Sequence, residues 1–295
     1  MKREEILEYF RNQGHDHVVK ADPTYIRVMT SNVLHTDARN SQSYELSYEE
    51  RADILAAMYL YFQPDFIGLQ EVSAPMQAAL TERFSDVYAF VDTPLGDYEN
   101  YCYHGVRSKQ NVTPVIYNKN LYEVLDSRYH LFDVLGLWSY QWALYRSKKD
   151  PSQRFIHMNL HYHYDGNQQM PGVIDVNNEL THLRRHYPKV PIFVTGDYNF
   201  QYTHKQYEVM VQGLGMQSGM LVAEDIEPNG RDYWCHLLGS TELQKNGSAI
   251  DHITVTEDLV NVKVHRVLYS ELLCKSSDHC SRFLDLELKN TESKK

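Results

Sequence analysis

The sequence predicts an α/β protein in which two β-sheets pack against each other and helices cover their outer faces. Apolar or alternating runs indicate about ten or more strands, and amphipathic runs indicate about five helices. These elements do not follow the regular β-α-β-α order of an open parallel sheet. With 42% hydrophobic residues, the chain can also form a large core.

Length and composition favour one domain over residues 1–295. No linker, internal repeat or low-complexity stretch divides the chain. We expect an N-terminal helical segment at 1–20 and a frayed, charged tail at 289–295. The net charge of −10 argues against a broad basic surface for duplex nucleic acid. It leaves open a local basic patch or a phosphate bound through a metal.

The first third of the chain supplies two strands and three helices. Ser47 and Glu50 form a capping-box pattern at the start of the second helix. The predicted helices cover 3–11, 47–61 and 75–84, and the predicted strands cover 26–33 and 66–69. Residues 92–111 are predicted to form a long loop of the kind that often binds ligands.

The rest of the chain is predicted to be richer in strands. Asn118 to Asn120 mark a turn, which predicts a hairpin between 112–117 and 122–125. A second strand pair, 139–145 with 154–162, surrounds a turn at 148–151. Further strands are expected at 191–194, 248–256, 259–269 and 283–288, helices at 173–187 and 204–213, a loop-rich stretch at 224–246, and a polar turn at 276–280.

Polar residues recur where these strands end or turn. Asp197 and Asn199 follow the apolar run 192–194, and they point the same way if the backbone stays extended. A carboxylate and a carboxamide suit an anion, a metal or an attacking water. The full set at strand ends and adjoining turns is Asn32, Glu71, His161, Asp197, Asn199, Asp251, Asp278 and His279.

In order and spacing, this set resembles the endonuclease/exonuclease/phosphatase superfamily, in its broad bacterial type. The matching segments extend over nearly the whole chain. They are SNV at 31–33, PDFIGLQEV at 64–72, PVIYNK at 114–119, NLH at 159–161, TGDYNF at 195–200, AIDHI at 249–253 and SDHC at 277–280. Trp142 also matches a tryptophan found in many bacterial members.

The resemblance implies a four-layer α/β-sandwich of the DNase I type, with two mainly antiparallel sheets flanked by helices. It also implies Mg²⁺-dependent attack of water on a phosphate ester, with Mn²⁺ as a possible substitute. Glu71 is then the expected first metal ligand, supported by Asn32 and Asp278 directly or through water.

The remaining roles also follow from the resemblance. Asp197 would orient or deprotonate the attacking water, and Asn199 would hold that water or a phosphate oxygen. His279 would donate a hydrogen bond to the phosphate or act as acid and base, with Asp251 fixing its tautomer. His161 would contact the phosphate from the other side.

Some positions depart from the family pattern. Asn111 stands where many members have a Glu that partners the strand histidine. Asn118 replaces a frequent Arg, and His35 follows the first strand without the usual nearby Asp. Phe200 and the segment Asp251-His252-Ile253 differ from inositide 5-phosphatases, which argues against that activity.

The leading functional prediction is a metal-dependent phosphoesterase, with a slight preference for phosphodiester, nuclease-type substrates. Aromatic residues at 98–103 could stack bases of a single-stranded nucleic acid. A phosphatase of a small phosphorylated metabolite or lipid headgroup stays open. The sequence also allows a non-catalytic binding member of the fold, or a zinc hydrolase built on His157, His161 and His163.

Targeting signals are not visible. The first ten residues are charged rather than apolar, no apolar run reaches about 18 residues, and the four cysteines (102, 235, 274 and 280) show no CxxC spacing. We therefore expect reduced thiols, a cytoplasmic location, no membrane span and no obligate protein partner.

Overall fold

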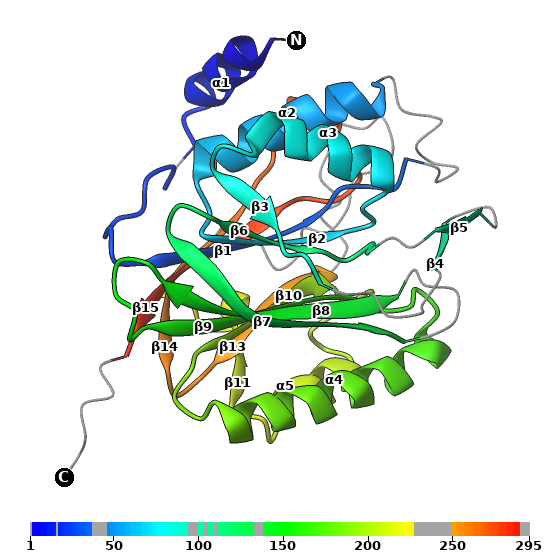
Figure 1. Ribbon diagram of the computed structural model, residues 1–295, viewed down its shortest axis with the longest axis vertical. Helices are drawn as coiled ribbons and strands as arrows, with labels where there is room; N and C mark the ends of the chain where they lie inside the picture. Colours follow the sequence, from blue (N-terminus) through cyan, green and yellow to red (C-terminus); the bar gives the residue numbers. More distant parts are fainter. Residues whose placement is uncertain are drawn as a thin grey trace.

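The computed structural model describes residues 2–15, 17–36, 46–93, 100–102, 106–108, 111–132, 138–226 and 249–289. Two β-sheets lie face to face in the middle of the molecule, and helices cover the outer side of each (Figure 1). The predicted four-layer sandwich is therefore confirmed.

The first sheet has seven strands and is centred on the parallel pair β1 and β2. Its β12–β14 pair is also parallel, and its other neighbours are antiparallel. In spatial order the strands are β12 (Asp225–Ile226), β14 (Val260–Val267), β15 (Arg282–Leu288), β1 (Ile26–Asn32), β2 (Phe66–Gln70), β6 (Val115–Asn118) and β3 (Tyr88–Phe90).

The second sheet has six strands and one parallel pair, β9 with β10. Its order is β11 (Met216–Ser218), β13 (Asp251–Thr256), β10 (Ile192–Asp197), β9 (Arg154–His161), β8 (Ser139–Ser147) and β7 (Tyr122–Leu131). A separate two-stranded sheet, β4 (Asn100–Cys102) and β5 (Val106–Ser108), lies within the stretch predicted as a long loop.

Helices pack on the two outer faces (Figure 1). The first sheet is covered by α2 (Tyr48–Phe62) and α3 (Ala74–Phe84), and α1 (Arg3–Asn12) packs against α2; the second sheet is covered by α4 (Gly166–His186) and α5 (Lys205–Val211). The two short helices are α6 (Gly219–Val222) and α7 (Glu271–Cys274). The predicted capping box is present, because Ser47 and Glu50 each accept from the other's backbone N–H. No helix in the described ranges has the length and hydropathy needed to cross a bilayer.

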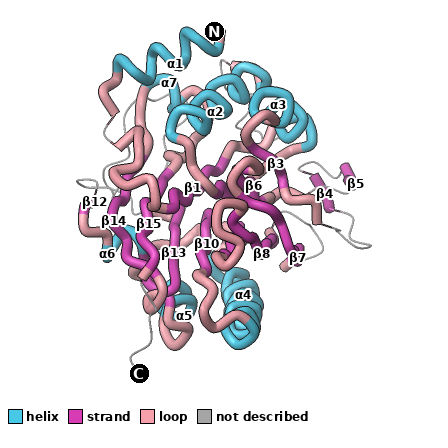
Figure 2. Tube along the Cα trace, turned by 60° about the vertical axis from the view of Figure 1, so that its left-hand side comes forward, coloured by secondary structure: helices cyan, strands magenta, loops and turns pink. Residues whose placement is uncertain are grey.

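Alternation along the strands separates three apolar layers. In β10, Ile192 and Val194 pack with α4 residues, whereas Phe193 faces the other sheet. In the first sheet, Val28 belongs to the layer between the sheets and Met29 to the layer under α2. Figure 2, turned by 60°, shows both sheets between their helices.

The layer between the sheets changes from aromatic to polar along the strands. At one end, the Phe66 ring centroid lies 6.0 Å from those of Phe155 and Phe193. Toward the other end, Gln70 Nε2 donates to Asn159 Oδ1 (2.6 Å), and Thr195 Oγ1 donates to the same oxygen (3.0 Å). This buried polar layer leads directly to the strand ends that carry the predicted site residues.

The predicted hairpin of 112–117 with 122–125 is wrong. Asn118 does form the turn, since its side chain accepts from Asn120 N and its carbonyl from Leu121 N. However, β6 pairs with β2 and β3 in one sheet, whereas β7 pairs with β8 in the other. Both edges of β6 are thus occupied, and the turn carries the chain from one sheet to the next.

Other expectations differ in their bounds. Helix α4 begins at Gly166, seven residues before the predicted start, because Asp165 caps it and Pro171 is accommodated inside it. The N-terminal helix ends at Asn12, and residues 17–24 form turns and bends rather than continuing to 20 as helix. The tail from 290, residue 1, and most of the loops predicted at 92–111 and 224–246 lie outside the described residues.

Candidate active site

The predicted site residues gather at one edge of both sheets. In the first sheet, Asn32 ends β1, Glu71 follows β2, and Asp278 and His279 precede β15. The second sheet repeats the pattern: Asp197 ends β10, His161 ends β9, and Asp251 begins β13. Because β15 and β13 run antiparallel to the central pairs, their starts lie at the same edge as the ends of those pairs.

Asp197 lies at the centre of this group and is 1% exposed. Its Oδ2 accepts from Asn32 Nδ2 (3.1 Å) and lies 3.5 Å from His161 Nε2 and 3.8 Å from His279 Nε2. Burial raises the pKa of the Asp197 carboxyl above its usual value, and the two histidines oppose this rise. The carboxylate therefore holds a proton more readily than an exposed Asp.

Asn199 reaches the site by a different route from the one predicted. Its backbone is left-handed (φ 52°) rather than extended, so the expected shared strand face does not exist. A turn brings it close instead, because Asn199 N donates to Asp197 Oδ1 (2.9 Å). Its Nδ2 donates to Tyr162 O (2.8 Å) and to His161 Nε2 (3.1 Å). The side-chain oxygen is then the group that it can offer to a water.

Glu71 also has a left-handed backbone (φ 62°), directly after β2. Its Oε2 accepts from His35 N (3.1 Å), and its Oε1 accepts from Asn32 Nδ2 (3.2 Å). Burial acts to raise the pKa of Glu71, but nearby His161 and His279, together with these hydrogen bonds, lower it overall. Glu71 is therefore held ionised.

Asn32 joins the two sheets through its amide group. Its Nδ2 donates to Glu71 and to Asp197, while its Oδ1 accepts from Leu34 N (3.0 Å). The side chain thus turns its NH₂ group, not its oxygen, toward the two carboxylates. In this arrangement Asn32 supports the two carboxylates as a hydrogen-bond donor.

His279 and Asp251 form a hydrogen-bonded pair across the two sheets. His279 Nδ1 lies 2.9 Å from Asp251 Oδ2, and both residues are buried or nearly so. Since a carboxylate only accepts, Nδ1 carries the proton, which leaves Nε2 on the side of Asp197. Residue Ser277 supports the turn, because it donates to Asn32 O and accepts from His279 N.

Asp278 precedes His279 in the turn before β15, and it belongs to neither group of possible metal ligands found among the described residues. Its pKa is raised to about 6, first by burial and then by the charges of Glu71 and Asp197, against the effect of His279. Its Oδ1 is buried with no hydrogen-bond partner in the described part of the chain. Such an orphaned carboxylate oxygen suits a cation ligand.

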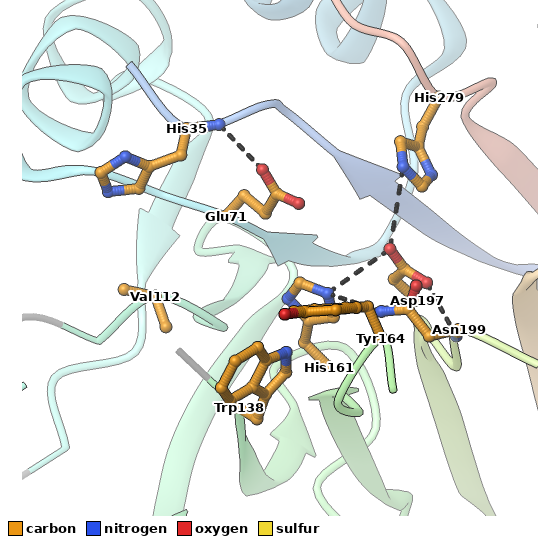
Figure 3. Close-up of a pocket in the computed structure, with 9 residues that line it drawn as sticks. All are labelled: His35, Glu71, Val112, Trp138, His161, Tyr164, Asp197, Asn199 and His279. Atoms are coloured by element: carbon orange, nitrogen blue, oxygen red, sulfur yellow. Dashed lines mark hydrogen bonds and ion pairs between the residues drawn. The ribbon is translucent and has the colours of Figure 1, made fainter. Parts of the chain in front are cut away.

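A cavity of about 200 Å³ opens over this group. Glu71, Asp197, His161, Asn199 and His279 line one part of it, and His35, Val112, Trp138 and Tyr164 line the rest (Figure 3). The last four were not predicted. Trp138 and Tyr164 lie in connections outside the strands, where no periodic pattern in the sequence points to them.

The comparison with known families identifies the family of the chain. A model of the endonuclease/exonuclease/phosphatase family matches residues 29–279. The chain belongs to this family. Members of the family hydrolyse phosphate esters, and the matched range includes every predicted site residue.

Solved structures of the family share this fold. An endonuclease/exonuclease/phosphatase family protein from Bacteroides thetaiotaomicron gives a TM-score of 0.74 at 18% identity, covering 90% of this chain and 98% of that chain. A mannosyl-6-phosphatase from the same organism gives 0.70 at 18%, covering 89% and 99%. TDP2 from D. rerio, complexed with a single strand DNA product, gives 0.68 at 15%, covering 90% and 99%. A search of curated protein sequences finds no significant match.

The donor set of this family member fits a hard divalent cation. Glu71, His161 and Asp197 offer ligand atoms within 4.8 Å of one another, as do Asp197, Asp251 and His279. Carboxylate oxygens, including the orphaned Oδ1 of Asp278, are the ligands that Mg²⁺ and Mn²⁺ prefer.

The alternative zinc site is not assembled. His157 is buried between the sheets, where its Nε2 bonds Thr195 Oγ1 and burial lowers its pKa to about 3. His163 accepts from Asp165 N and stacks on Trp138. Four residues along a strand span about 13 Å, so His157 and His161 cannot chelate one ion. Neither metal-competent cluster found among the described residues includes His157 or His163.

Asn111, which replaces the Glu common in the family, is part of a different contact. Its Nδ2 donates to Gln141 Oε1 (2.9 Å), and its Oδ1 accepts from Thr113 N (2.9 Å). Gln141 in turn donates to Val91 O and Thr93 Oγ1. Asn111 therefore contacts Gln141 of β8, and Gln141 in turn connects β8 to the residues that follow β3.

Proposed function

We propose that the protein is a divalent-metal-dependent phosphoesterase that hydrolyses a phosphate ester by attack of water. One observation carries the proposal: both sheets supply acidic and imidazole groups to a single cavity, with Asp197 at its centre. A binding module has no need for a buried carboxylate with a raised pKa between two histidines.

Asp197 is proposed to orient the attacking water and to take up its proton. Its raised pKa makes the carboxylate a better base than an exposed Asp. Asn199 would position the same water through its carbonyl oxygen, because both hydrogens of its Nδ2 are used by Tyr162 and His161. This geometry favours a role toward water over a role toward a phosphate oxygen.

The histidines are proposed to bind the phosphate from two sides. His279, with Nδ1–H held by Asp251, would donate from a protonated Nε2 to a phosphate oxygen and pass a proton to the leaving group. His161 would contact the phosphate from the second sheet through its Nδ1–H, because its Nε2 accepts from Asn199. Asn32 is proposed to fix the positions of the Glu71 and Asp197 carboxylates relative to each other, because its NH₂ group donates to both.

Glu71 and Asp278 are proposed to hold Mg²⁺, or Mn²⁺ in its place. Glu71 is ionised, and each of its oxygens accepts one hydrogen bond, which leaves lone pairs for a cation. When bound, the ion would neutralise the phosphate and stabilise the departing oxygen.

A phosphodiester is the proposed ester type. The D. rerio TDP2 structure holds a single strand DNA product, which supports nuclease-type chemistry on this fold, and a single strand is compatible with the net charge of −10. The mannosyl-6-phosphatase keeps the phosphatase of a small phosphorylated molecule as the second candidate. Both activities would use the same residues.

The test is hydrolysis of bis-p-nitrophenyl phosphate, p-nitrophenyl phosphate, single-stranded DNA and inositol phosphates with Mg²⁺, Mn²⁺ or EDTA. We expect EDTA and Glu71→Ala each to abolish turnover, and Asp197→Asn to lower kcat/KM by about 10²–10⁴-fold. Glu82→Ala, which removes an exposed carboxylate from α3, is the matched control. Turnover that survives both EDTA and Glu71→Ala would contradict the proposal.

A further inference from the structure

Three aromatic rings, those of Trp138, His163 and Tyr164, pack in a row beside the cavity, and we call them the aromatic wall. Trp138 and His163 have ring centroids 3.7 Å apart with planes at 31°, and the His163 and Tyr164 centroids are 4.8 Å apart at 33°. Trp138 and Tyr164 both line the cavity (Figure 3). The proposed hydrolysis assigns no task to these two rings.

Hydrogen bonds hold this wall in place. Asp165 N donates to His163 Nδ1 (2.8 Å), at the point where Asp165 caps α4. Gln169 Nε2 donates both to His163 O (2.9 Å) and to Asn199 O (2.9 Å). The aromatic segment is therefore tied to the loop that carries Asn199, and a ligand on the wall meets a preorganised surface.

Tyr164 leaves an unusual amount of ring in contact with solvent. Its exposure is 69%, and it is the one tyrosine among the strongly exposed large apolar side chains of the described residues. Trp138, by contrast, is 7% exposed and supports the wall from behind. A large exposed ring at the rim of a polar cavity is typical of a ligand-binding surface.

The cavity lining is divided by chemistry. Glu71, Asp197 and His279 give the lining ionisable groups, whereas Val112, Trp138 and Tyr164 give it apolar and aromatic surface (Figure 3). Within the part of the chain that the structure describes, this apolar and aromatic group includes no carboxylate or carboxamide side chain to pair with sugar hydroxyls. A planar base needs few such partners, whereas a pyranose leaves several hydroxyls to satisfy.

We propose that Tyr164, supported by Trp138 and His163, stacks against the nucleobase of a nucleotide whose phosphate occupies the site at Asp197 and His279. This deepens the proposed function, on which it rests, by naming nucleotide phosphate esters as the substrate class. Tyr164 acts as a specificity residue and takes no part in the chemical step.

The test compares two competitors that share a phosphate and a ribose but differ in the base. Uridine 5′-monophosphate and ribose 5-phosphate are used as inhibitors of bis-p-nitrophenyl phosphate hydrolysis in Mg²⁺. Because one stacked base contributes about 1–3 kcal/mol, we expect uridine monophosphate to inhibit at a roughly tenfold lower concentration.

Substitutions at Tyr164 distinguish the effect of an aromatic ring from the effect of side-chain size. Tyr164→Leu should reduce the preference for uridine monophosphate to less than about threefold, with ribose 5-phosphate unaffected, whereas Tyr164→Phe should retain it. Ile174→Ala, at an exposed position on α4, is the control. It is expected to leave the inhibition constants of uridine monophosphate and ribose 5-phosphate unchanged. Equal inhibition by the two competitors in the wild type, or an undiminished preference in Tyr164→Leu, would overturn the proposal.

Base stacking at Tyr164 can also be tested if the protein does not catalyse the proposed hydrolysis. If no phosphate ester is turned over, the same two compounds are titrated while tryptophan fluorescence is recorded, because Trp138 lies in the wall. Quenching by uridine monophosphate that Tyr164→Leu weakens and Tyr164→Phe keeps would support base stacking without catalysis. Quenching that is equal for ribose 5-phosphate would contradict it.

Discussion

Asp278 shows how a single carboxyl group can link stability to metal binding. Its folded-state pKa of about 6 lies above the ordinary value of 3.8, so the folded protein binds the proton more tightly than the unfolded chain does. The contribution of Asp278 to stability is therefore present in full below about pH 4 and is lost as the pH rises through 6. The ionised group is unfavourable unless a cation sits beside it.

We predict that Asp278→Asn makes the metal-free protein more stable at pH 7 than the wild type, by on the order of 2–3 kcal/mol, with little difference at pH 4. Urea unfolding in EDTA at the two pH values measures this. The apparent affinity of the wild type for Mg²⁺, from calorimetric titration, should rise between pH 5 and 7, because Asp278 must lose its proton to bind. A wild-type affinity that is flat across this range would contradict the role of Asp278 as a ligand.

Backbone conformation at the residue scale was not predictable from the sequence. Leu34, Glu71 and Asn199 all have positive φ values (57°, 62° and 52°), and all three lie next to strand ends of the site. Asn tolerates this region, but Leu and Glu give no such signal. The surrounding hydrogen bonds fix these conformations. The structure brings the predicted side chains to one edge of the sheets, but it places Asn199 in a turn rather than on the expected extended strand.

At the scale of elements, β2 and β9 approach closely through Gly68. A Cβ at this position would lie 1.9 Å from Thr195 Oγ1 and 2.3 Å from Asn159 Oδ1. Asn159 is fixed by hydrogen bonds to Leu69 O and Gln70, and it lies on the strand that ends in His161. The spacing between the sheets therefore depends on the absence of a side chain here.

Gly68→Ala should thus destabilise the fold by about 2 kcal/mol or more and lower kcat/KM, because the polar layer must move and His161 moves with it. Urea unfolding and hydrolysis assays measure the two effects. The matched control is Gly166→Ala at the start of α4, where the added Cβ would be 3.8 Å from its nearest neighbour. Equal stability of the two variants would show that the sheets can separate at no cost.

Elements with strong periodicity were predicted well, but the strand pairs were predicted correctly only in part. The period-2 pattern and the turn at 148–151 gave β8 and β9 as a pair, as observed. The same reasoning paired β6 with β7, although they belong to different sheets. A turn in the sequence marks a change of direction, but the sheet that a strand joins depends on which edges distant strands leave open. Tyr164 and Trp138 were not predicted for a related reason, because only tertiary contacts bring these two side chains to the cavity.

At the scale of the whole molecule, β1 carries a buried ion pair near one end and a site residue at the other. Arg27 Nε and Nη2 donate to Asp285 Oδ1 (2.6 Å) and Oδ2 (2.7 Å), and Nη1 donates to Val18 O and Phe62 O. Both partners are fully buried. Arg27 thus connects β15, the end of α2 and the N-terminal segment, and it lies at the opposite end of the strand from Asn32.

Arg27→Met should cost about 3–5 kcal/mol, because it leaves the Asp285 carboxylate buried without its cation. The double variant Arg27→Met with Asp285→Leu should recover much of that loss. Below their unfolding temperatures, both variants are expected to keep the wild-type kcat/KM. Thermal unfolding followed by assay at low temperature distinguishes this outcome from a direct effect on the site, which would appear as lost activity in a folded protein.

The chain crosses from the first sheet to the second at the turn formed by Asn118 to Asn120, and this has a practical consequence. Cutting the polypeptide at exposed Asn120 would put Asn32 and Glu71 on one fragment, and His161, Asp197, Asp251 and His279 on the other. Neither fragment alone would contain all of the proposed catalytic and metal-binding residues. Turnover would then occur only when the two fragments associate. Fusing each fragment to one of two other proteins would therefore give a split-enzyme sensor of the association of those two proteins.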